Sequence, residues 1–132
     1  VSTVSSYKGV REVMVREQRK IAASGGVVLE GRDIGTVVLP QAELKIFMVA
    51  TVEERAKRRM KELAQNGIEA DLEEIMKEIE IRDQKDSTRE TSPLKKASDA
   101  LVLDTSTMTI EEQVQFVVER AMKIIHHEVV AL

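Results

Sequence analysis

Short apolar segments alternate with amphipathic helical segments along the 132 residues of this chain. The apolar runs at residues 27–29, 43–50 and 100–104 have the length and the Ile, Val and Leu content of buried strands. Around them, apolar residues recur at intervals of three and four, which predicts helices. Strands that alternate with helices need crossover connections, so the sequence predicts a single α/β domain with a mainly parallel sheet.

Local signals mark where the predicted helices begin and end. A helix over residues 9–23 is followed by Gly25 and Gly26, and glycine tolerates the left-handed conformation of a helix C-cap. Thr51 and Thr109 each stand three residues before the second Glu of a Glu-Glu pair. This spacing is typical of a capping box, in which the Thr hydroxyl accepts an amide and the Glu reaches back to the Thr amide.

Further helical boundaries follow from the same reasoning. The helix after Thr51 is expected to stop at Asn66-Gly67, and another is expected to begin after Asp71. Residues 82–99 are polar and contain Pro93, which predicts a partly ordered loop. The apolar stripes expected to face inward are Val52, Ala56, Met60 and Leu63, then Leu72, Ile75, Met76 and Ile79, and finally Ile110, Val114, Val117, Val118, Ala121 and Ile125.

Composition excludes several classes of protein. The net charge is −3 and the chain has three aromatic residues, which argues against a general nucleic-acid binder. The absence of cysteine excludes disulfides and thiolate metal sites. The apolar runs are too short to span a bilayer, so the sequence predicts a cytoplasmic protein without a membrane segment.

The segment Gly31-Arg32-Asp33 directly follows the first predicted strand. Ligands of open α/β sheets bind at the carboxyl ends of the strands. The guanidinium group of Arg32 suits phosphate or carboxylate, and Asp33 can accept a hydrogen bond from an amino or hydroxyl group. The alternative, which the triplet alone favours, is a turn with an internal Arg–Asp ion pair.

Two further groups of charged residues are candidates for anion binding. Arg55, Arg58 and Arg59 crowd one turn of a predicted helix, although a solvated face neutralised by neighbouring glutamates is the alternative.

The second group contains Arg82, Asp86 and Arg89, with spacings of four and three. If the preceding helix continues this far, the three share one face and fit a sugar phosphate. The alternative is a salt-bridge ladder within the helix. Arg11 is a possible fourth cation, or else an ordinary surface residue.

Other catalytic patterns are not found in the sequence. His126, His127 and Glu128 are adjacent and would point in different directions on a helix, which disfavours metal chelation. The 132 residues contain no Gly-x-x-x-x-Gly-Lys-Ser/Thr, so they carry no Walker A phosphate loop. Many arginines and few candidate bases suit phosphoryl transfer, where positioning and charge neutralisation dominate.

Several of these segments, in this order and spacing, closely resemble bacterial cytidylate (CMP) kinases. They include Gly-Arg-Asp-Ile-Gly-Thr-Val-Val-Leu-Pro at 31–40, Glu-Leu-Lys-Ile-Phe at 43–47 and Glu-Glu-Arg-Ala-Lys-Arg-Arg at 53–59. The resemblance continues to Asp-Ala-Leu-Val-Leu-Asp at 99–104 and covers essentially the whole chain. The residues that carry it in between are Arg82, Asp83, Asp86, Arg89, Ser92, Pro93 and Leu94.

The resemblance implies a fold and a reaction. The fold is the P-loop nucleoside monophosphate kinase fold, here incomplete, with three strands, flanking helices and no Walker A strand. The family transfers the γ-phosphoryl group of ATP, with Mg²⁺, to CMP or dCMP. Residues 1–132 correspond to the C-terminal part of the core domain, with a lid region at about 55–70 and a CMP-contacting segment at about 82–99.

The resemblance also implies roles for residues of the N-terminal third. Arg32 and Asp33 match family residues that meet the pyrimidine nucleotide. Ser2 and Arg11 match residues that surround its base and phosphate.

Five further residues acquire roles from the resemblance. Arg82 and Arg89 match phosphate-binding arginines, and Asp86 matches the carboxylate that holds the ribose. Arg58 and Arg59 match the helix that leads to the lid, where arginines approach the transferring group.

A chain without the Walker A strand is expected to be inactive alone. Unpaired strand edges favour association, so the missing strand is expected to come from an N-terminal segment or from a second copy of the chain. The alternative is a non-catalytic nucleotide-binding or assembly module derived from the same fold. Another nucleoside monophosphate kinase fits less well, because the Gly-Arg-Asp and Ser-Pro-Leu combination points to cytidylate.

Overall fold

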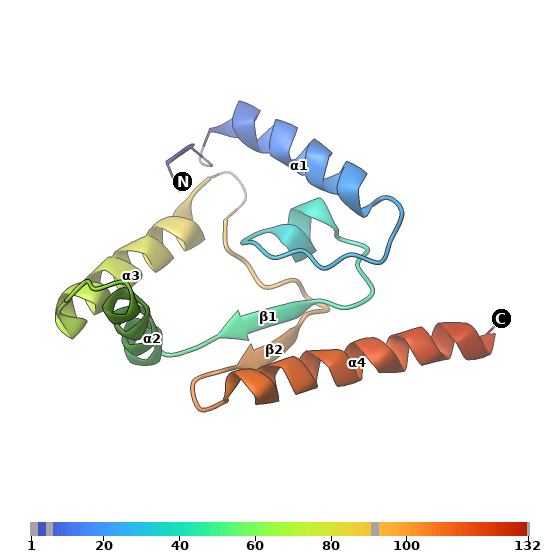
Figure 1. Ribbon diagram of the computed structural model, residues 1–132. Helices are drawn as coiled ribbons and strands as arrows, with labels where there is room; N and C mark the ends of the chain where they lie inside the picture. The colour runs from blue at the N-terminus through green and yellow to red at the C-terminus, as the bar shows by residue number, and fades with distance from the viewer. Residues whose placement is uncertain (1–2, 5–6, 91–92, 132) are drawn as a thin grey trace. The chain divides into compact units, whose positions relative to one another are not determined.

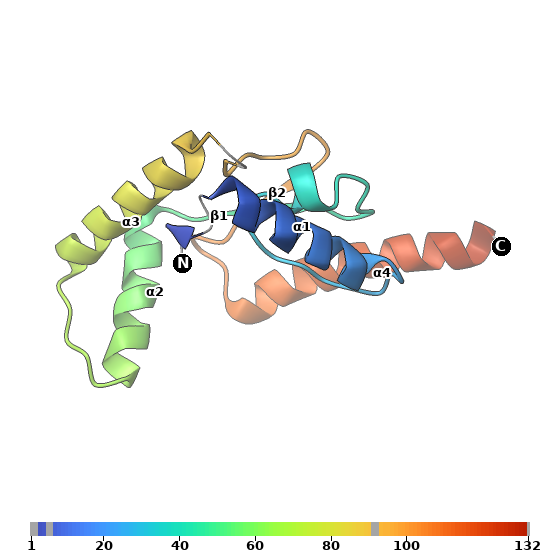
Figure 2. The ribbon, with the colours of Figure 1, turned by 90° about the horizontal axis from the view of Figure 1, so that it is seen from above.

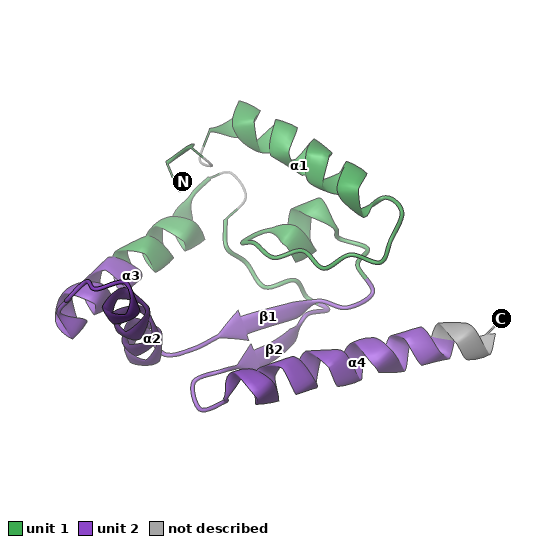
Figure 3. Cartoon of the chain, viewed as in Figure 1, with its two compact units in different colours: residues 1–42, 81–98 green, residues 43–80, 99–132 purple. Residues whose placement is uncertain are grey.

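A computed structural model describes residues 3–4, 7–90 and 93–131. The chain divides into two compact units (Figure 3). Unit 1 contains residues 1–42 and 81–98, and unit 2 contains residues 43–80 and 99–132. The elements in chain order (Figure 1) are α1 (Lys8–Ala22), the short π-helix η2 (Ile34–Val38), β1 (Ile46–Val49), α2 (Val52–Gln65), α3 (Leu72–Thr88), β2 (Leu101–Asp104) and α4 (Ile110–Ala131).

The sheet of unit 2 consists of β1 and β2. The two strands are parallel, with a register that runs from Ile46 opposite Leu101 to Val49 opposite Asp104. Two helices separate them along the chain, as a parallel connection requires. The prediction of a parallel sheet is therefore confirmed, with both strands shorter than the apolar runs suggested.

The first predicted strand does not form. Residues 27–30 are not part of any strand, and the side chain of Val28 is 96% exposed. A strand needs a hydrogen-bonded neighbour, and no described segment pairs with this one. The sheet of the described residues therefore has two strands where the sequence predicted three.

The starts of α2 and α4 confirm the predicted caps, but they differ in detail. At α4 the capping box is reciprocal: Glu112 N donates to Thr109 Oγ1 (3.1 Å) and Thr109 N donates to Glu112 Oε2 (2.8 Å). At α2, Glu54 N donates to Thr51 Oγ1 (3.2 Å), but Thr51 N donates elsewhere, to Ser106 Oγ (3.0 Å). The cap of α2 thus includes a residue that lies beyond β2.

The turns and the length of α3 follow the sequence only in part. Gly67 has a φ of +74° and ends α2 as predicted, after which the chain returns into α3 (Figure 2). The loop predicted from residue 82 is wrong for residues 82–88, because α3 continues to Thr88. Asp86, near this end of the helix, is 5% exposed and forms an ion pair with Arg32. This tertiary contact stabilises the last turns of α3, in which apolar residues do not recur at helical spacing.

The predicted apolar stripes of α2 and α3 each contain one buried residue and three half-buried ones, whereas most of the predicted α4 stripe is exposed. Ala56 and Ile75 lie in the core of unit 2. On α4, Ile110 is 74% exposed and Val114 is 55% exposed, and no described segment covers that face. None of the helices described has the length and apolarity needed to cross a membrane.

Removal of the α4 cap tests the local origin of that helix. We expect Thr109→Ala to lower the free energy of unfolding by about 0.5–2 kcal/mol, because the hydroxyl that accepts the Glu112 amide is lost. Urea denaturation followed by circular dichroism measures the effect. The control is Thr107→Ala at an exposed position of the preceding turn. Equal effects of the two substitutions would contradict a capping role.

Candidate functional site

Unit 1 gathers four arginines and two aspartates around one pocket of about 200 Å³. They come from α1, from the segment that precedes η2 and from the C-terminal end of α3 and the residue after it. These residues are far apart in the sequence, so the pocket depends on the packing of unit 1. The charged residues that line it are Arg11, Arg32, Asp33, Arg82, Asp86 and Arg89.

Asp33 is one of two buried carboxylates in this pocket. It is 3% exposed, and its Oδ2 accepts a hydrogen bond from Nη2 of Arg11, whose side chain is also largely buried. The Asp33 carbonyl accepts the amides of Val37 (2.9 Å) and Val38 (3.2 Å), which anchors η2. Asp33 therefore joins α1 to η2.

Gly31 lies beside this anchor. A Cβ atom at Gly31 would come within 3.0 Å of the Ile34 side chain, which lines the same pocket. The absence of a side chain at position 31 thus lets Ile34 pack against the backbone.

Asp86 is the second buried carboxylate, with an exposure of 5%. Its Oδ2 accepts a hydrogen bond from Arg32 Nε (3.0 Å), and Arg82 Nε lies 3.9 Å away. The Asp86 carbonyl also accepts the amide of Leu94 (2.7 Å), so the segment after α3 is held at the same place. The predicted salt bridge within the helix exists between Arg82 and Asp86. The predicted ion pair within the Gly31-Arg32-Asp33 turn is wrong, because Arg32 pairs with Asp86 and Asp33 pairs with Arg11.

The charge of this pocket favours an anion. The two carboxylates neutralise half of the positive charge of the four guanidinium groups, which leaves a surplus that a phosphate monoester dianion would match. The Nε atom of Arg11 is buried and has no hydrogen-bond acceptor among the described residues. The carboxylates can accept hydrogen bonds from hydroxyl or amino groups of the same ligand.

The structure brings together every predicted substrate contact that it describes. Ser2 is the exception, since it lies outside the described residues. Sequence reasoning missed Met14 and Gln18, which line the pocket from α1. Their spacing of three and seven residues from Arg11 places them on the same face of the helix, so helical periodicity could have identified them.

Arg58 and Arg59 belong to unit 2, where both lie on α2. Arg58 Nε donates to Glu54 Oε1 (3.2 Å), and its terminal nitrogens donate to Thr105. Arg59 Nη1 donates to Glu62 Oε2 (2.9 Å). Each arginine therefore has a carboxylate partner on its own helix.

Three carboxyl or amino groups of unit 2 have shifted pKa values. Hydrogen bonding and then the charge of Lys57 lower the pKa of Glu53, and Glu53 raises the pKa of Lys57 in the same way. The hydroxyl and amide of Ser106 lower the pKa of Asp104 by hydrogen bonding to its carboxylate. All three groups are exposed to solvent. Among the described residues, no three His, Asp or Glu side chains lie close enough together to hold a metal ion.

Comparisons with known proteins show the family to which the chain belongs. The family model "Cytidylate kinase" matches residues 1–127. Proteins named cytidylate kinase from Streptococcus pyogenes serotype M4 (strain MGAS10750) and serotype M5 (strain Manfredo) are each 57% identical to this chain over 125 residues. The match covers 95% of this chain and 55% of each relative, so the chain spans about half the length of the curated relatives it matches.

The buried pair of Arg11 and Asp33 predicts a measurable stability effect. We expect Arg11→Ala to lower the free energy of unfolding by about 3–5 kcal/mol, because it leaves a buried carboxylate without its guanidinium partner. Urea denaturation compares it with Arg16→Ala, an exposed arginine on the same helix. A loss below about 0.5 kcal/mol, as is usual for surface positions, would show that the pair is not needed for folding.

Proposed function

Because this chain belongs to the cytidylate kinase family, we propose that it forms the CMP-binding part of a kinase that transfers a phosphoryl group from ATP to CMP or dCMP. The observation that carries this proposal is the pocket of unit 1, in which four guanidinium groups converge with two buried carboxylates. The activity belongs to the complete protein, since the chain spans about half the length of its relatives.

The phosphate and the ribose of the nucleotide are assigned to one side of the pocket. Arg32, Arg82 and Arg89 hold the phosphate, since guanidinium groups form paired, charge-assisted hydrogen bonds to phosphate oxygens. Asp86 accepts a hydrogen bond from a ribose hydroxyl. Arg32 donates to Asp86, so the group proposed to recognise the sugar also keeps a phosphate-binding group in position.

The base is assigned to Arg11 and Asp33, with Ser2 as a further contact. The pocket of about 200 Å³ is smaller than the roughly 300–1,000 Å³ of common ligand sites. Binding of a whole nucleotide therefore requires the two internal ion pairs to open, and hydrogen bonds to the ligand replace those they lose.

The reaction itself needs groups from outside this pocket. ATP is the phosphoryl donor, and Mg²⁺ neutralises charge on its phosphates; no residue of this chain is assigned to the metal. Arg58 and Arg59 lie in the lid region at about 55–70, where Arg59 is proposed to approach the transferring group and Arg58 to support it. The strand that carries the Walker A loop is proposed to come from an N-terminal segment, and a cytoplasmic location remains a prediction.

A second candidate function is a nucleotide-binding module without catalysis. It rests on the same pocket, whose arginines and aspartates can bind a nucleoside monophosphate without any transfer of phosphate. The two functions share the same CMP pocket and differ only in turnover.

Binding of CMP to the chain tests the assignment of the pocket. We expect Arg32→Ala to weaken binding about 10- to 100-fold in calorimetric titrations, because one charge-assisted phosphate contact is lost. Arg32→Lys retains the charge and is expected to bind with intermediate affinity. Arg16→Ala, at an exposed position on α1, is the control and keeps the affinity of the unmodified chain. Unchanged affinity in Arg32→Ala would contradict the role of this arginine.

An assay with ATP, Mg²⁺ and CMP separates the two candidate functions. We expect no turnover by the chain alone, because its 132 residues lack a phosphate loop for ATP. Joined to the N-terminal segment of a Streptococcus pyogenes relative, the chain is expected to form CDP. Turnover by the chain alone would refute the need for that loop. Retained CMP binding without turnover in the joined protein would favour the non-catalytic module.

A further inference from the structure

We propose that Arg58 is a positioning residue, which holds α2 against the carboxyl ends of both strands and so sets the direction of the helix that carries Arg59. This inference rests on the proposed function, because it assigns Arg58 a task in presenting Arg59 to the reaction. It is carried by a set of hydrogen bonds within unit 2.

The guanidinium group of Arg58 reaches from the second turn of α2 to the residue that follows β2. Its Nη1 donates to Thr105 Oγ1 (3.0 Å), and its Nη2 donates to the Thr105 carbonyl oxygen. Thr105 is 2% exposed, so these contacts are made at a buried partner. A fork of two donors on one residue fixes the orientation of the guanidinium plane as well as its position.

Thr105 in turn is bound to the other strand. Its amide donates to the Val49 carbonyl (2.8 Å), and its hydroxyl donates to the same oxygen (3.3 Å). The Thr105 hydroxyl therefore accepts from Arg58 and donates to β1. Through this one residue, Arg58 is linked to the ends of both β1 and β2.

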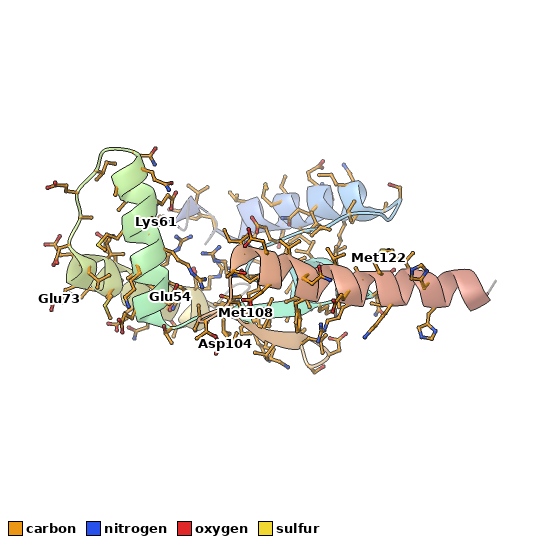
Figure 4. The ribbon with its side chains drawn as sticks, turned by 60° about the horizontal axis from the view of Figure 1, so that its bottom comes forward. Glu54, Lys61, Glu73, Asp104, Met108 and Met122 are labelled. Carbon is orange, nitrogen blue, oxygen red and sulfur yellow. The ribbon has the colours of Figure 1, made fainter. Side chains whose placement is uncertain are left out.

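Ser106 makes a second link between α2 and the end of β2. Its hydroxyl accepts the amide of Thr51 (3.0 Å) and donates to Asp104 Oδ1 (2.7 Å). The Ser106 amide donates to the same carboxylate oxygen (3.0 Å). Figure 4 labels Glu54 on α2 and Asp104 at the end of β2. We call the five residues Thr51, Glu54, Arg58, Thr105 and Ser106 the strand-end clasp.

The helix cap of α4 provides an internal comparison. There, Glu112 returns to the amide of Thr109 and completes a local capping box. In α2 the equivalent Glu54 is hydrogen-bonded to Arg58 Nε (3.2 Å), and Ser106 takes the amide of Thr51. The same local sequence therefore forms a closed capping box at α4 but not at α2, where Glu54 contacts Arg58 instead. Departures from local sequence rules of this kind are expected at functional sites.

Arg58 and Arg59 differ in what they would lose on moving to a ligand. Arg59 pairs with Glu62 on the exposed side of the helix, and surface pairs of this kind contribute little to stability. If Arg58 moved to a ligand, the buried hydroxyl of Thr105 would lose a hydrogen bond, which is unfavourable for a buried polar group. The two arginines therefore differ: Arg59 has an exposed carboxylate partner on its own helix, and Arg58 is also hydrogen-bonded to a buried residue beyond β2.

Kinetics of the joined protein test the positioning role. Thr105→Val removes the hydroxyl and keeps the shape, and Arg58→Lys removes the fork and keeps the charge. We expect each to lower kcat about tenfold with an unchanged KM for CMP, since one oriented hydrogen bond is lost. The double variant is expected to be no worse than either single one, and Thr105→Ser is expected to retain the original kcat. An unaffected Thr105→Val beside an impaired Arg58→Lys, or additive losses, would overturn the inference.

Hydrogen exchange of the chain by itself tests the clasp independently of turnover. We expect the amides of Thr51 and Thr105 to exchange about tenfold faster in both Thr105→Val and Arg58→Lys. Arg59→Lys is the matched control and is expected to leave both amides unchanged. Unchanged exchange in the first two variants would refute the clasp. If the joined protein shows no turnover, the proposed kinase function fails, and this exchange measurement alone decides the inference.

Discussion

The two buried carboxylates of unit 1, Asp33 and Asp86, constrain most of what surrounds them. A buried charge is unfavourable unless it is paired and hydrogen-bonded. Asp33 meets Arg11 from α1, and Asp86 meets Arg32 from the segment before η2. These requirements bring three distant stretches of the chain to one pocket. Among the described residues of unit 1, Val38 is the only buried apolar one. Because unit 1 has so little apolar core, its ion pairs hold these three stretches together.

Unit 2 is organised by a different constraint, the backbone pairing of two parallel strands. Ala56, Ile75 and Leu103 supply its buried apolar core, and the ladder between β1 and β2 is completed by the amide of Thr105. At the carboxyl ends of the strands, polar side chains replace apolar ones. Arg58 of α2 is hydrogen-bonded to Thr105 at these strand ends. The strand ends therefore also orient α2, the helix that carries the proposed catalytic Arg59.

The pocket and the clasp use arginine in opposite ways. In the pocket, ion pairs between Arg32 and Asp86 hold groups that a nucleotide is proposed to take over. In the clasp, Arg58 donates to the backbone and hydroxyl oxygens of Thr105, which is buried. Phosphoryl transfer needs both, because positioning and charge neutralisation together account for most of its catalysis.

Local sequence signals determined the helices, their caps and the two paired strands, since the interactions of a capping box or an apolar stripe lie within a few residues. The charged residues around the pocket could be selected from spacing and from family resemblance. Their convergence, the continuation of α3 to Thr88 and the hydrogen bond from the Thr51 amide to Ser106 were decided by tertiary structure. Residues 27–30 have the composition of a strand but lack a described partner, because strand formation depends on a neighbour that composition alone does not specify.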